Sequence, residues 1–532
     1  MTFPIQDVLV AIFPIVLLVF LMAKRKSMPS YYALPLVAVL LYLLKIFYFE
    51  SDLELMNATV VEGLLTAWTP ILVVWGAIFI FESMENTGGL NIIRKWLNYV
   101  TTNKVGQLMI IGWAFMFLVE GASGFGTPAA LAAPLLVGLG FRPLKVAVFC
   151  LIMNSIPVTF GAVGIPVWFG LGQLGLSESE LLMAGFKAGI IHFAAALVIP
   201  LIALSFVVKW REVFKNIGFI YLSILSCTVP YLALAYYNYE FPSLVGGAFG
   251  LVLTVLFAIF GIGLRRGKKE RFIGVLRVPK LVRALFPIWG TIILLVATRI
   301  KQFGIGEILT STAHTFEVGL GGVVDFSVSS SLVLGLKNIF GTGVNWSHSL
   351  LYVPSLIPFF LVGFLSFLFF RGKKGVVKKT WNEAWGRIKK PILALSGALV
   401  FVKLLMVGGD GALTMIIGKT LADLAGNYWQ FFASYLGALG AFFAGSNTIS
   451  NLTFGGIQQA VAQDLGLNVT TILGAQSAGG AMGNMICIAN IVAVCSVLNL
   501  KEKMGEILKR TVVPMLIYGV IAGVVSFGLD LI

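Results

Sequence analysis

A series of apolar runs, each about as long as a membrane-crossing helix, dominates the sequence. About 20 apolar residues are needed to cross the hydrocarbon core of a bilayer as a helix. Lipid offers no hydrogen-bond partners, so a crossing segment must satisfy its own backbone groups, as a helix does. The chain is therefore predicted to be an all-α polytopic membrane protein. The runs occupy residues 8–23, 31–48, 62–82, 185–208, 217–236, 243–263, 284–300, 351–370, 391–407 and 513–531.

The composition excludes the soluble classes of protein. Of the 532 residues, 58% are hydrophobic and only 11% are charged, whereas soluble domains carry about 25% charged residues. A soluble enzyme, a fibre, a disordered chain and a disulfide scaffold are excluded on this ground. The net charge of +15 could indicate nucleic-acid binding, but in a membrane protein it more often reflects basic cytoplasmic loops. We therefore expect the lipid bilayer, and no nucleic acid, as a partner.

The charges around the apolar runs predict the orientation of the chain. Asp7 precedes the first run and the basic residues 24–26 follow it, the reverse of a secretory signal, so we expect this run to be retained. Basic loops stay in the cytoplasm, which places both the N-terminus and the C-terminus outside a plasma or inner membrane. The basic loops are 94–104, 209–215, 265–283, 371–390 and 501–510, and the acidic or neutral ones are 50–54, 177–180, 236–240 and 408–423. Residues 301–350 are polar and predicted external, and no structure is inferred for them.

Two glycine-rich segments interrupt this pattern. In the first, about 107–140, an apolar arm ends at Leu118, a glycine-rich tip follows at 120–128, and a second apolar arm completes the segment. Neither arm is expected to span, and basic residues flank both ends, which predicts a re-entrant hairpin. Irregular backbone at membrane depth is tolerated only inside protein or beside an aqueous cavity. The glycine- and proline-containing stretch 154–166 is predicted to be a helix broken in its middle.

The second segment, about 428–463, has the same order of features, with its polar tip at 445–451 and a broken stretch at 477–484. The tip residues Gly121 and Gly445 are 324 positions apart, and the later Gly140 and Gly466 are 326 apart. Acidic flanks indicate entry from outside, so the repeats are predicted to be inverted, as in secondary transporters. Two unrelated glycine-rich helices are the alternative, since glycine is common in membrane helices. The predicted parts are N-terminal spans (1–61), a first inverted repeat (62–208), connecting spans and basic loops (209–390) and a second inverted repeat (391–532).

The hairpin tips are the predicted substrate site. Thr127 followed by a proline has the pattern of an N-cap, and Ser450 or Asn451 is the expected cap of the second tip. A helix N-terminus attracts a carboxylate. The neighbouring hydroxyl and amide groups either bind a substrate hydroxyl or hydrogen bond to one another between the hairpin arms. The predicted substrate-binding residues are Gly121, Ser123, Gly124, Gly126, Thr127, Asn154, Ser446, Asn447, Thr448, Ser450, Asn451 and Ser477.

Three of the ionisable residues within or beside the apolar runs are candidates for a role in transport. Glu120 is the predicted proton carrier, because a carboxyl group that leaves water binds a proton more readily; the alternative is a structural glutamate that binds backbone amides of the tip. His192 is either a proton relay or, the favoured interpretation, a buried histidine with satisfied hydrogen bonds. Lys403 is a candidate partner for Glu120 or for a substrate anion.

Motifs for other chemistry do not occur in the sequence. There is no Walker motif, no nucleophile paired with a base and no paired-histidine metal motif, so we expect neither ATP-driven transport, nor an enzyme, nor a metal or other cofactor. The four cysteines lie in or beside apolar stretches and are expected to be small buried hydrophobic residues. They are Cys150, Cys227, Cys487 and Cys495.

The motifs at 120–128 (Glu-Gly-Ala-Ser-Gly-Phe-Gly-Thr-Pro), 135–143, 154–166 and 445–451 (Gly-Ser-Asn-Thr-Ile-Ser-Asn) resemble those of the lactate permease family. The resemblance runs from the first span to the last. It implies symport of L-lactate, D-lactate or glycolate with a proton. It also implies inverted repeats with re-entrant hairpins, of a kind thought to work by elevator motion.

The chain departs from the family pattern at two places. After Gly483 the family usually has Lys-Met-Ile-Ser-Pro-Gln, where this chain has Asn-Met-Ile-Cys-Ile-Ala at 484–489. The difference removes a lysine, a proline and a glutamine at an expected edge of the site. Lys403 stands where the family usually has an apolar residue, so it is a candidate replacement for the missing charge.

The leading hypothesis is a proton-coupled symporter of a small 2-hydroxy monocarboxylate. Its alternative is a sodium-coupled transporter of another small carboxylate, in which oxygens of the tips coordinate Na⁺. A membrane enzyme or an open channel is disfavoured, because broken inverted repeats suit alternating access better. The sequence leaves the oligomeric state, including a homodimer, open.

Overall fold

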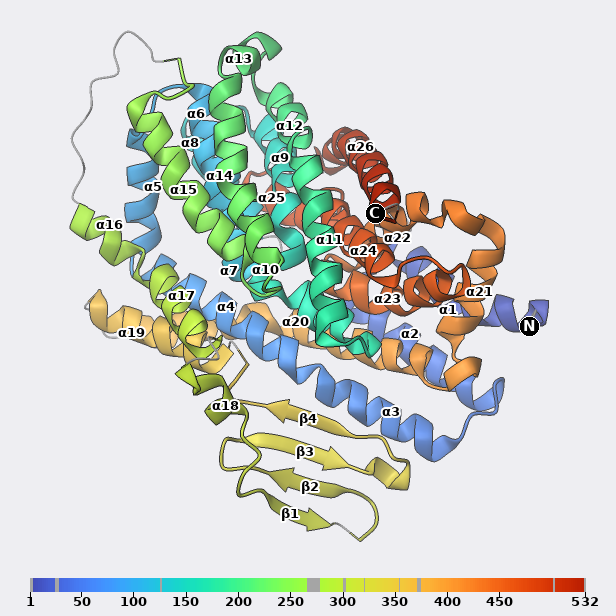
Figure 1. The fold of residues 1–532 in the computed structure, drawn as a ribbon. Coiled ribbons are helices and arrows are strands. Elements are labelled where there is room, and N and C mark those ends of the chain that lie inside the picture. The colour runs from blue at the N-terminus through green and yellow to red at the C-terminus, as the bar shows by residue number, and fades with distance from the viewer. Residues whose placement is uncertain are drawn as a thin grey trace. The chain divides into compact units, whose positions relative to one another are not determined.

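The structure, a computed structural model, describes residues 3–23, 28–124, 127–265, 278–299, 303–319, 321–353, 355–370, 375–500 and 503–530 (Figure 1). Helices make up most of these residues. Nine of the described helices are long and apolar enough to cross a membrane. A tenth candidate is the pair α11 (Glu178–Ala196) and α12 (Ile199–Val207), bent by 42° at its break. The predicted polytopic helical membrane protein is thus confirmed, although the apolar runs 284–300 and 351–370 form shorter helices.

The chain forms two compact units, each built from two separate stretches. The first unit comprises Met1–Ile92 and Pro279–Ile417, and the second comprises Ile93–Val278 and Gly418–Ile532. Elements of the first unit are α1 (Ile5–Ala23), α2 (Ser30–Phe47), α3 (Leu53–Thr66), α4 (Trp68–Asn86), α17 (Phe286–Arg299), α18 (Ile305–Thr310), four strands from β1 (Phe316–Gly319) to β4 (Trp346–Ser349), η7 (Ser355–Leu361), α19 (Val362–Phe369) and α20 (Val376–Met406). Helices α5 (Gly89–Tyr99), α16 (Val278–Ala284) and α21 (Leu413–Ala425) cross the boundaries.

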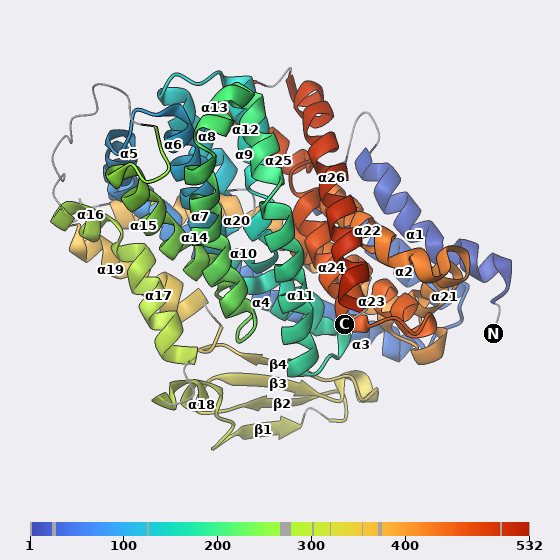
Figure 2. The same cartoon turned by 45° about the horizontal axis from the view of Figure 1, so that its top comes forward.

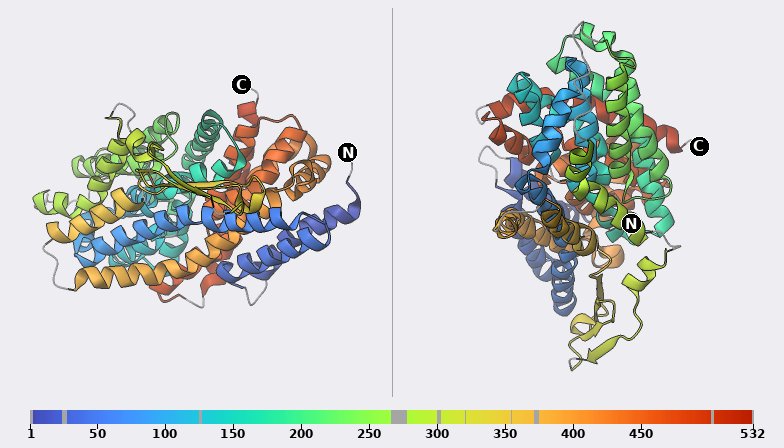
Figure 3. Two further views of the ribbon diagram at one scale, coloured as in Figure 1. Left: turned by 90° about the horizontal axis from the view of Figure 1, so that it is seen from below. Right: turned by 90° about the vertical axis from the view of Figure 1, so that its left-hand side faces the viewer.

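Helix α20 contacts three other long helices of the first unit. It packs against α2, α3 and α4, and Figure 3 shows it in orange beside the blue N-terminal helices. Two glycines allow the backbones to approach closely: a Cβ at Gly397 would overlap the backbone of Pro35, and one at Gly63 would overlap that of Val400. Small residues at such crossings are typical of helices packed in membranes, where close van der Waals contact drives association.

A four-stranded antiparallel sheet occupies part of the stretch 301–350, for which no structure is inferred from the sequence. Its strands are β1 (Phe316–Gly319), β2 (Asp325–Val328), β3 (Val333–Lys337) and β4 (Trp346–Ser349), and they lie side by side in chain order (Figures 1 and 2). The β1–β2 turn contains the exposed Gly321 and Gly322, with φ of +61° and +80°. The sheet is an addition to the all-α prediction, which holds for the membrane helices.

His348 anchors β4 to the start of α4. Its Nδ1 lies 2.9 Å from Oγ1 of Thr69, the ring of Trp346 stacks on the imidazole, and the side chain is 5% exposed. Burial lowers the pKa of His348, so the folded protein favours the neutral ring. The stabilisation is complete above the unfolded pKa of about 6.5 and is lost as the pH falls below it.

We therefore expect a lower unfolding temperature at pH 5 than at pH 7.5, measured by tryptophan fluorescence in detergent. Replacement of His348 by Asn, whose amide can reach Thr69, should shrink this difference. An unchanged difference in His348→Asn would show that other groups cause the acid sensitivity.

The second unit contains both predicted hairpins. In the first, α6 (Lys104–Met109), η1 (Ile110–Phe115) and α7 (Met116–Ser123) run on to Gly124, whose φ is +59°, and α8 (Thr127–Gly138) returns. This first arm, Lys104–Ser123, has 20 residues and is long and apolar enough to cross a membrane. The expectation that neither arm could span is therefore wrong for it, because the helix continues beyond Leu118 as far as Ser123.

The second hairpin has the same order of elements. Helix α22 (Trp429–Ala444) ends at Gly445, with φ of +74°, and α23 (Asn447–Asp464) follows. Helix α24 (Val469–Gly483) packs on both arms (Figure 2). Each hairpin is followed by a broken helix. The other elements are α9 (Pro143–Met153), η2 (Ile156–Phe160), α10 (Gly161–Ile165), η3 (Pro166–Leu171), η4 (Gly172–Leu174), α13 (Trp210–Lys215), α14 (Ile217–Ala235), α15 (Pro242–Phe260), α25 (Ile488–Val497) and α26 (Met504–Asp530).

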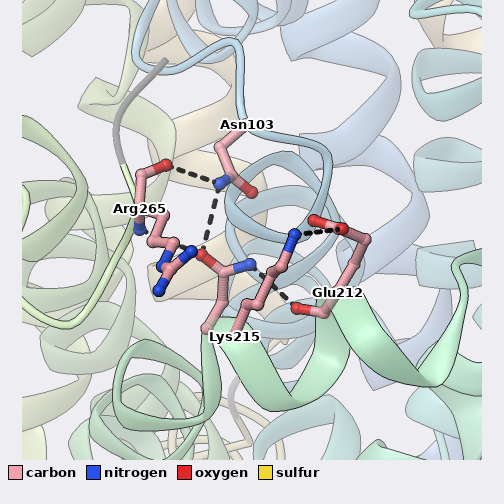
Figure 4. Close-up of polar contacts among 5 residues, drawn as sticks. Asn103, Glu212, Lys215 and Arg265 are labelled. Atoms are coloured by element: carbon pink, nitrogen blue, oxygen red, sulfur yellow. Dashed lines mark hydrogen bonds and ion pairs between the residues drawn. The ribbon is translucent and has the colours of Figure 1, made fainter. Parts of the chain in front are cut away.

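Side-chain amides join three chain segments at one end of this unit (Figure 4). Nδ2 of Asn103, before α6, donates to the backbone carbonyl of Arg265 (2.9 Å) and to Oδ1 of Asn216 (3.3 Å). The same Asn216 oxygen accepts from the Arg265 backbone N–H at 3.0 Å. Lys215 and Glu212 form an exposed ion pair beside this cluster at 3.1 Å. These bonds hold the start of the first hairpin against the α13–α14 junction and the end of α15.

Candidate functional site

A small cavity in the second unit is lined by both hairpin tips. Glu120 and Gly124 line it from the first tip, and Asn447 and Thr448 line it from the second. The space not filled by protein atoms, including the open solvent at its mouth, measures about 310 Å³. The two broken helices complete the walls with Val158, Gly161, Ala162, Pro166 and Asn484, and Gly445 and Ser446 add to the second tip.

Glu120 is the acidic group of this cavity. Its side chain is 2% exposed, and Oε2 accepts a hydrogen bond of 2.9 Å from Nδ2 of Asn154. A Cβ added to Gly161 would overlap Oε1 of Glu120, so this second oxygen lies against a glycine that lines the cavity. No ion pair joins Glu120 to a cation among the residues described. A buried carboxylate without a cation is costly.

The wall facing Glu120 has an unusual backbone. Ala162, Val163 and Gly164 have φ of +46°, +58° and +72°, a region that only glycine enters freely and that is strained for a β-branched residue. The indole N–H of Trp168 donates to the carbonyl of Val163 at 2.8 Å. A Cβ at Gly164 would overlap the backbone of Tyr239. These contacts fix the conformation of the broken helix beside the cavity. Strained backbone of this kind is often found at functional sites.

The second tip presents a helix N-terminus to the cavity. The N-cap of α23 is Ser446, whose side chain accepts from the N–H of Ile449 at 3.4 Å. The expectation that Ser450 or Asn451 caps this helix is wrong, because α23 already begins at Asn447 and both residues lie within its first two turns. The free N–H groups and the dipole of this end of α23 attract negative charge.

A polar cluster lies directly behind the second tip. Nδ2 of Asn451 donates to Oγ of Ser477 (3.0 Å) and to the carbonyl of Pro166 (2.8 Å). Nδ2 of Asn447 lies 3.4 Å from both Oγ of Ser477 and Oγ1 of Thr159. The Oδ1 atoms of Asn154, Asn447 and Asn451 are buried and have no hydrogen-bond partner among the residues described. Of these three residues Asn447 lines the cavity, and an unpartnered buried amide oxygen there fits a ligand that brings a donor or a cation.

The predicted site residues divide into three groups. Glu120, Gly124, Ser446, Asn447 and Thr448 line the cavity, and Asn154, Asn451 and Ser477 belong to the polar groups beside it. Three have other contacts: Gly121 packs on the backbone of Leu244, Ser123 donates to the Val119 carbonyl (2.9 Å), and Ser450 donates to the Gly437 carbonyl (2.7 Å). Gly126 and the side chain of Thr127 lie outside the described residues.

Part of the cavity wall was not predicted from the sequence. Val158, Gly161, Ala162 and Pro166 lie in the broken stretch 154–166, and its glycines and prolines were the signal that could have selected them. Asn484 also lines the cavity, so one departure from the lactate permease pattern falls within the site. All four cysteines are buried and free, as expected.

Lys403 has a different partner from those expected. Its Nζ lies 2.6 Å from Oε1 of Glu62, and each side chain is 19% exposed. The candidate pairing with Glu120 is therefore not found, because Glu62 in α3 of the same unit already neutralises this charge.

Breaking this ion pair should destabilise the protein. Lys403→Met leaves Glu62 partly buried without its partner, and we expect a loss of about 2 kcal/mol, read as a lower unfolding temperature in detergent. The double variant Lys403→Met/Glu62→Leu should recover most of that loss, because no uncompensated charge remains. A double variant no more stable than Lys403→Met would contradict this assignment.

The whole arrangement suits the reversible binding of a small anion. A helix N-terminus offers N–H donors, a buried carboxyl group can hold one proton, and amide and hydroxyl groups surround the space. One proton and one small monovalent anion that bind together at such a site leave its net charge unchanged.

The family model described as L-lactate permease matches residues 7–532 of the chain. A Haemophilus influenzae protein, provisionally named as an L-lactate permease, is 50% identical over 97% of both chains. The L-lactate permease of Bacillus subtilis is 28% identical, covering 92% of this chain and 89% of its own. Glycolate permease GlcA of Escherichia coli is 26% identical, covering 97% and 94%. Among solved structures, Neisseria gonorrhoeae MtrF, from a study of antimetabolite efflux pumps, aligns over 98% of each chain with 12% identity and a TM-score of 0.47.

Proposed function

This chain belongs to the L-lactate permease family, and we propose that it takes up L-lactate, and also D-lactate or glycolate, in symport with a proton. The names of the relatives support the substrate class, since they cover both lactate and glycolate. The observation that carries the coupling is the position of Glu120, buried and without a cationic partner among the described residues, in the same cavity as the N-terminus of α23.

Electrostatics links the proton to the substrate. Two carboxylates in one small cavity repel each other, so one of them binds a proton. With Glu120 protonated, the single negative charge of lactate meets the positive end of α23 and the neutral amides of the tip. Lactate and proton then cross together as an electroneutral pair. Binding of lactate in the cavity is disfavoured while Glu120 is ionised, which prevents uptake of the anion without a proton.

The topology proposed with this function follows the charge of the loops. Both hairpins are taken as re-entrant and the two repeats as inverted, with the N- and C-termini outside. The similar order of elements, a hairpin with a positive-φ glycine and then a broken helix, supports a common origin of the repeats. Transport by a homodimer is compatible with this scheme.

Uptake by purified protein in liposomes tests the proposal. An inward proton gradient should concentrate radiolabelled L-lactate, and unlabelled D-lactate or glycolate should compete, while acetate, which lacks the 2-hydroxyl group, should compete less. A sodium gradient at equal pH should have no effect. Failure of a proton gradient to concentrate any of the three hydroxy acids would reject the symport.

Sodium coupling to another small carboxylate is the second candidate, favoured by one observation. The unpartnered oxygens of Asn447 and Asn451, beside hydroxyl groups and an irregular backbone, resemble the oxygen surroundings in which transporters hold Na⁺ at broken helices. The same liposomes decide: uptake that follows sodium and is insensitive to pH would select this function instead.

A further inference from the structure

A line of hydrogen bonds leads from η2, whose Val158 lines the cavity, to helix α26. Oγ1 of Thr159 in η2 donates to the backbone carbonyl of Ser477 in α24 (3.1 Å) and lies 2.7 Å from Nε2 of His192 in α11. On the other side of the imidazole, Nδ1 of His192 bonds to the hydroxyl group of Tyr518 in α26. The four residues are 0% exposed, so water does not compete for these bonds.

The donors and acceptors in this line are determined by one proton. The hydroxyl proton of Thr159 has two acceptors within reach, the Ser477 carbonyl and Nε2 of His192. We assign it to the carbonyl, because a carbonyl oxygen can only accept; Thr159 then accepts from His192, and the imidazole proton lies on Nε2. Nδ1 is then an acceptor, and Tyr518 donates to it. The rings of Tyr231 and Tyr518 pack edge-on against the imidazole, with centroids 6.2 and 6.1 Å away. No acidic side chain among the described residues hydrogen bonds to the ring, so an imidazolium would be a buried cation without a counter-ion.

Thr159 also joins the two halves of the site. Its neighbours Val158 and Gly161 line the cavity from the first broken helix. Its hydroxyl group contacts Ser477 of α24 and lies 3.4 Å from Nδ2 of Asn447, which lines the cavity from the second tip. A shift of Thr159 would therefore move a wall residue and release the amide of Asn447.

We infer that His192 is a positioning residue: as a neutral imidazole it holds Thr159, and through Thr159 it fixes Asn447 at the substrate site, without carrying the transported proton. The inference rests on the proposed function only in taking this cavity as the substrate site. The two residues then have different roles: His192 positions the site, and Glu120 binds the proton.

Two replacements of His192 separate its two nitrogens. The amide nitrogen of Gln can reach the position of Nε2 and donate to Thr159, whereas the shorter Asn reproduces only Nδ1. We expect His192→Gln to keep the KM for lactate within about twofold, and His192→Asn to raise it about five- to tenfold, the effect of one lost hydrogen bond. Thr159→Val should raise KM similarly, and Thr159→Ser should restore it.

A double variant shows whether the two residues act through each other. In a Thr159→Val background, His192→Asn should raise KM no further, because the bond that it breaks is already lost. Independent, additive effects would overturn the inference. So would a His192→Gln protein that exchanges lactate normally but fails to accumulate it along a proton gradient, since that result would make His192 the proton carrier.

The tautomer can be measured without any transport assay. The chain has three histidines, so ¹⁵N-histidine labelling gives three imidazoles, and His192→Gln identifies the signal of His192. We expect the Nε2–H tautomer from pH 5 to pH 8. A protonated ring or the Nδ1–H tautomer would overturn the inference even if lactate uptake is confirmed. The expected tautomer in a protein that transports no hydroxy acid would reject the proposed function and leave the hydrogen-bond line standing.

Discussion

Replacing Glu120 by Gln abolishes accumulation of lactate along a proton gradient but leaves exchange of internal for external lactate within about threefold of the wild-type rate, if Glu120 carries the proton. Gln resembles the protonated carboxyl group, so the site stays able to bind the anion. With one proton per lactate, a gradient of one pH unit, about 1.4 kcal/mol, concentrates lactate about tenfold in the wild type. The variant should reach no more than the outside concentration.

The matched control is Glu178→Gln, an exposed carboxylate in the first turn of α11 in the same unit, which should transport like the wild type. Undiminished accumulation by Glu120→Gln would mean that another group carries the proton. Loss of exchange by a protein that still elutes as a single species would mean instead that the ionised carboxylate of Glu120 binds substrate or holds the tip.

Substitution of Gly479 by Val should have the largest effect on stability. Helices α22 and α24 pack backbone to backbone: a Cβ at Gly479 would overlap the carbonyl of Ser434, and one at Gly437 would overlap that of Gln476. Gly483, one turn after Gly479, meets Ala438 in the same way. This small-xxx-small spacing lets membrane helices approach closely. Val would force them apart at a cost of about 3 kcal/mol.

The expected result is a marked loss of monodisperse protein in size-exclusion chromatography and a lower unfolding temperature. The control is Gly528→Val in α26, where no atom lies within 4 Å of an added Cβ, so only the smaller helix propensity effect remains. Equal behaviour of the two variants would show that the α22–α24 crossing tolerates separation.

The sequence predicted those parts of the fold and the site that depend on local residue types. The predicted hairpin tips at 120–128 and 445–451 contain Gly124 and Gly445, and both glycines have the positive φ that favours this residue. Apolar length indicated the spans. Glu120, Asn447 and Thr448 were found because polar residues stand out within apolar runs, and they line one cavity.

The parts that were missed depend on contacts between distant residues or on unfavourable local conformations. Thr159 meets Ser477 across 318 positions, a separation that no local pattern reveals. Ala162 and Val163 adopt a left-handed backbone that their residue types disfavour, so their stretch was expected to break but its shape could not be predicted. The sheet consists of strands of only four or five residues, too short for a clear alternation.

The small sheet offers a way to determine which side of the membrane each loop of the protein occupies. Gly321 and Gly322 form an exposed turn with open space around both Cβ positions, so a short insertion there disturbs no packing. A protease recognition sequence placed in this turn would report, in intact cells, which compartment the sheet occupies. Cleavage by externally added protease would anchor the orientation of every loop, because the number of crossings between this turn and each terminus then decides where that terminus lies.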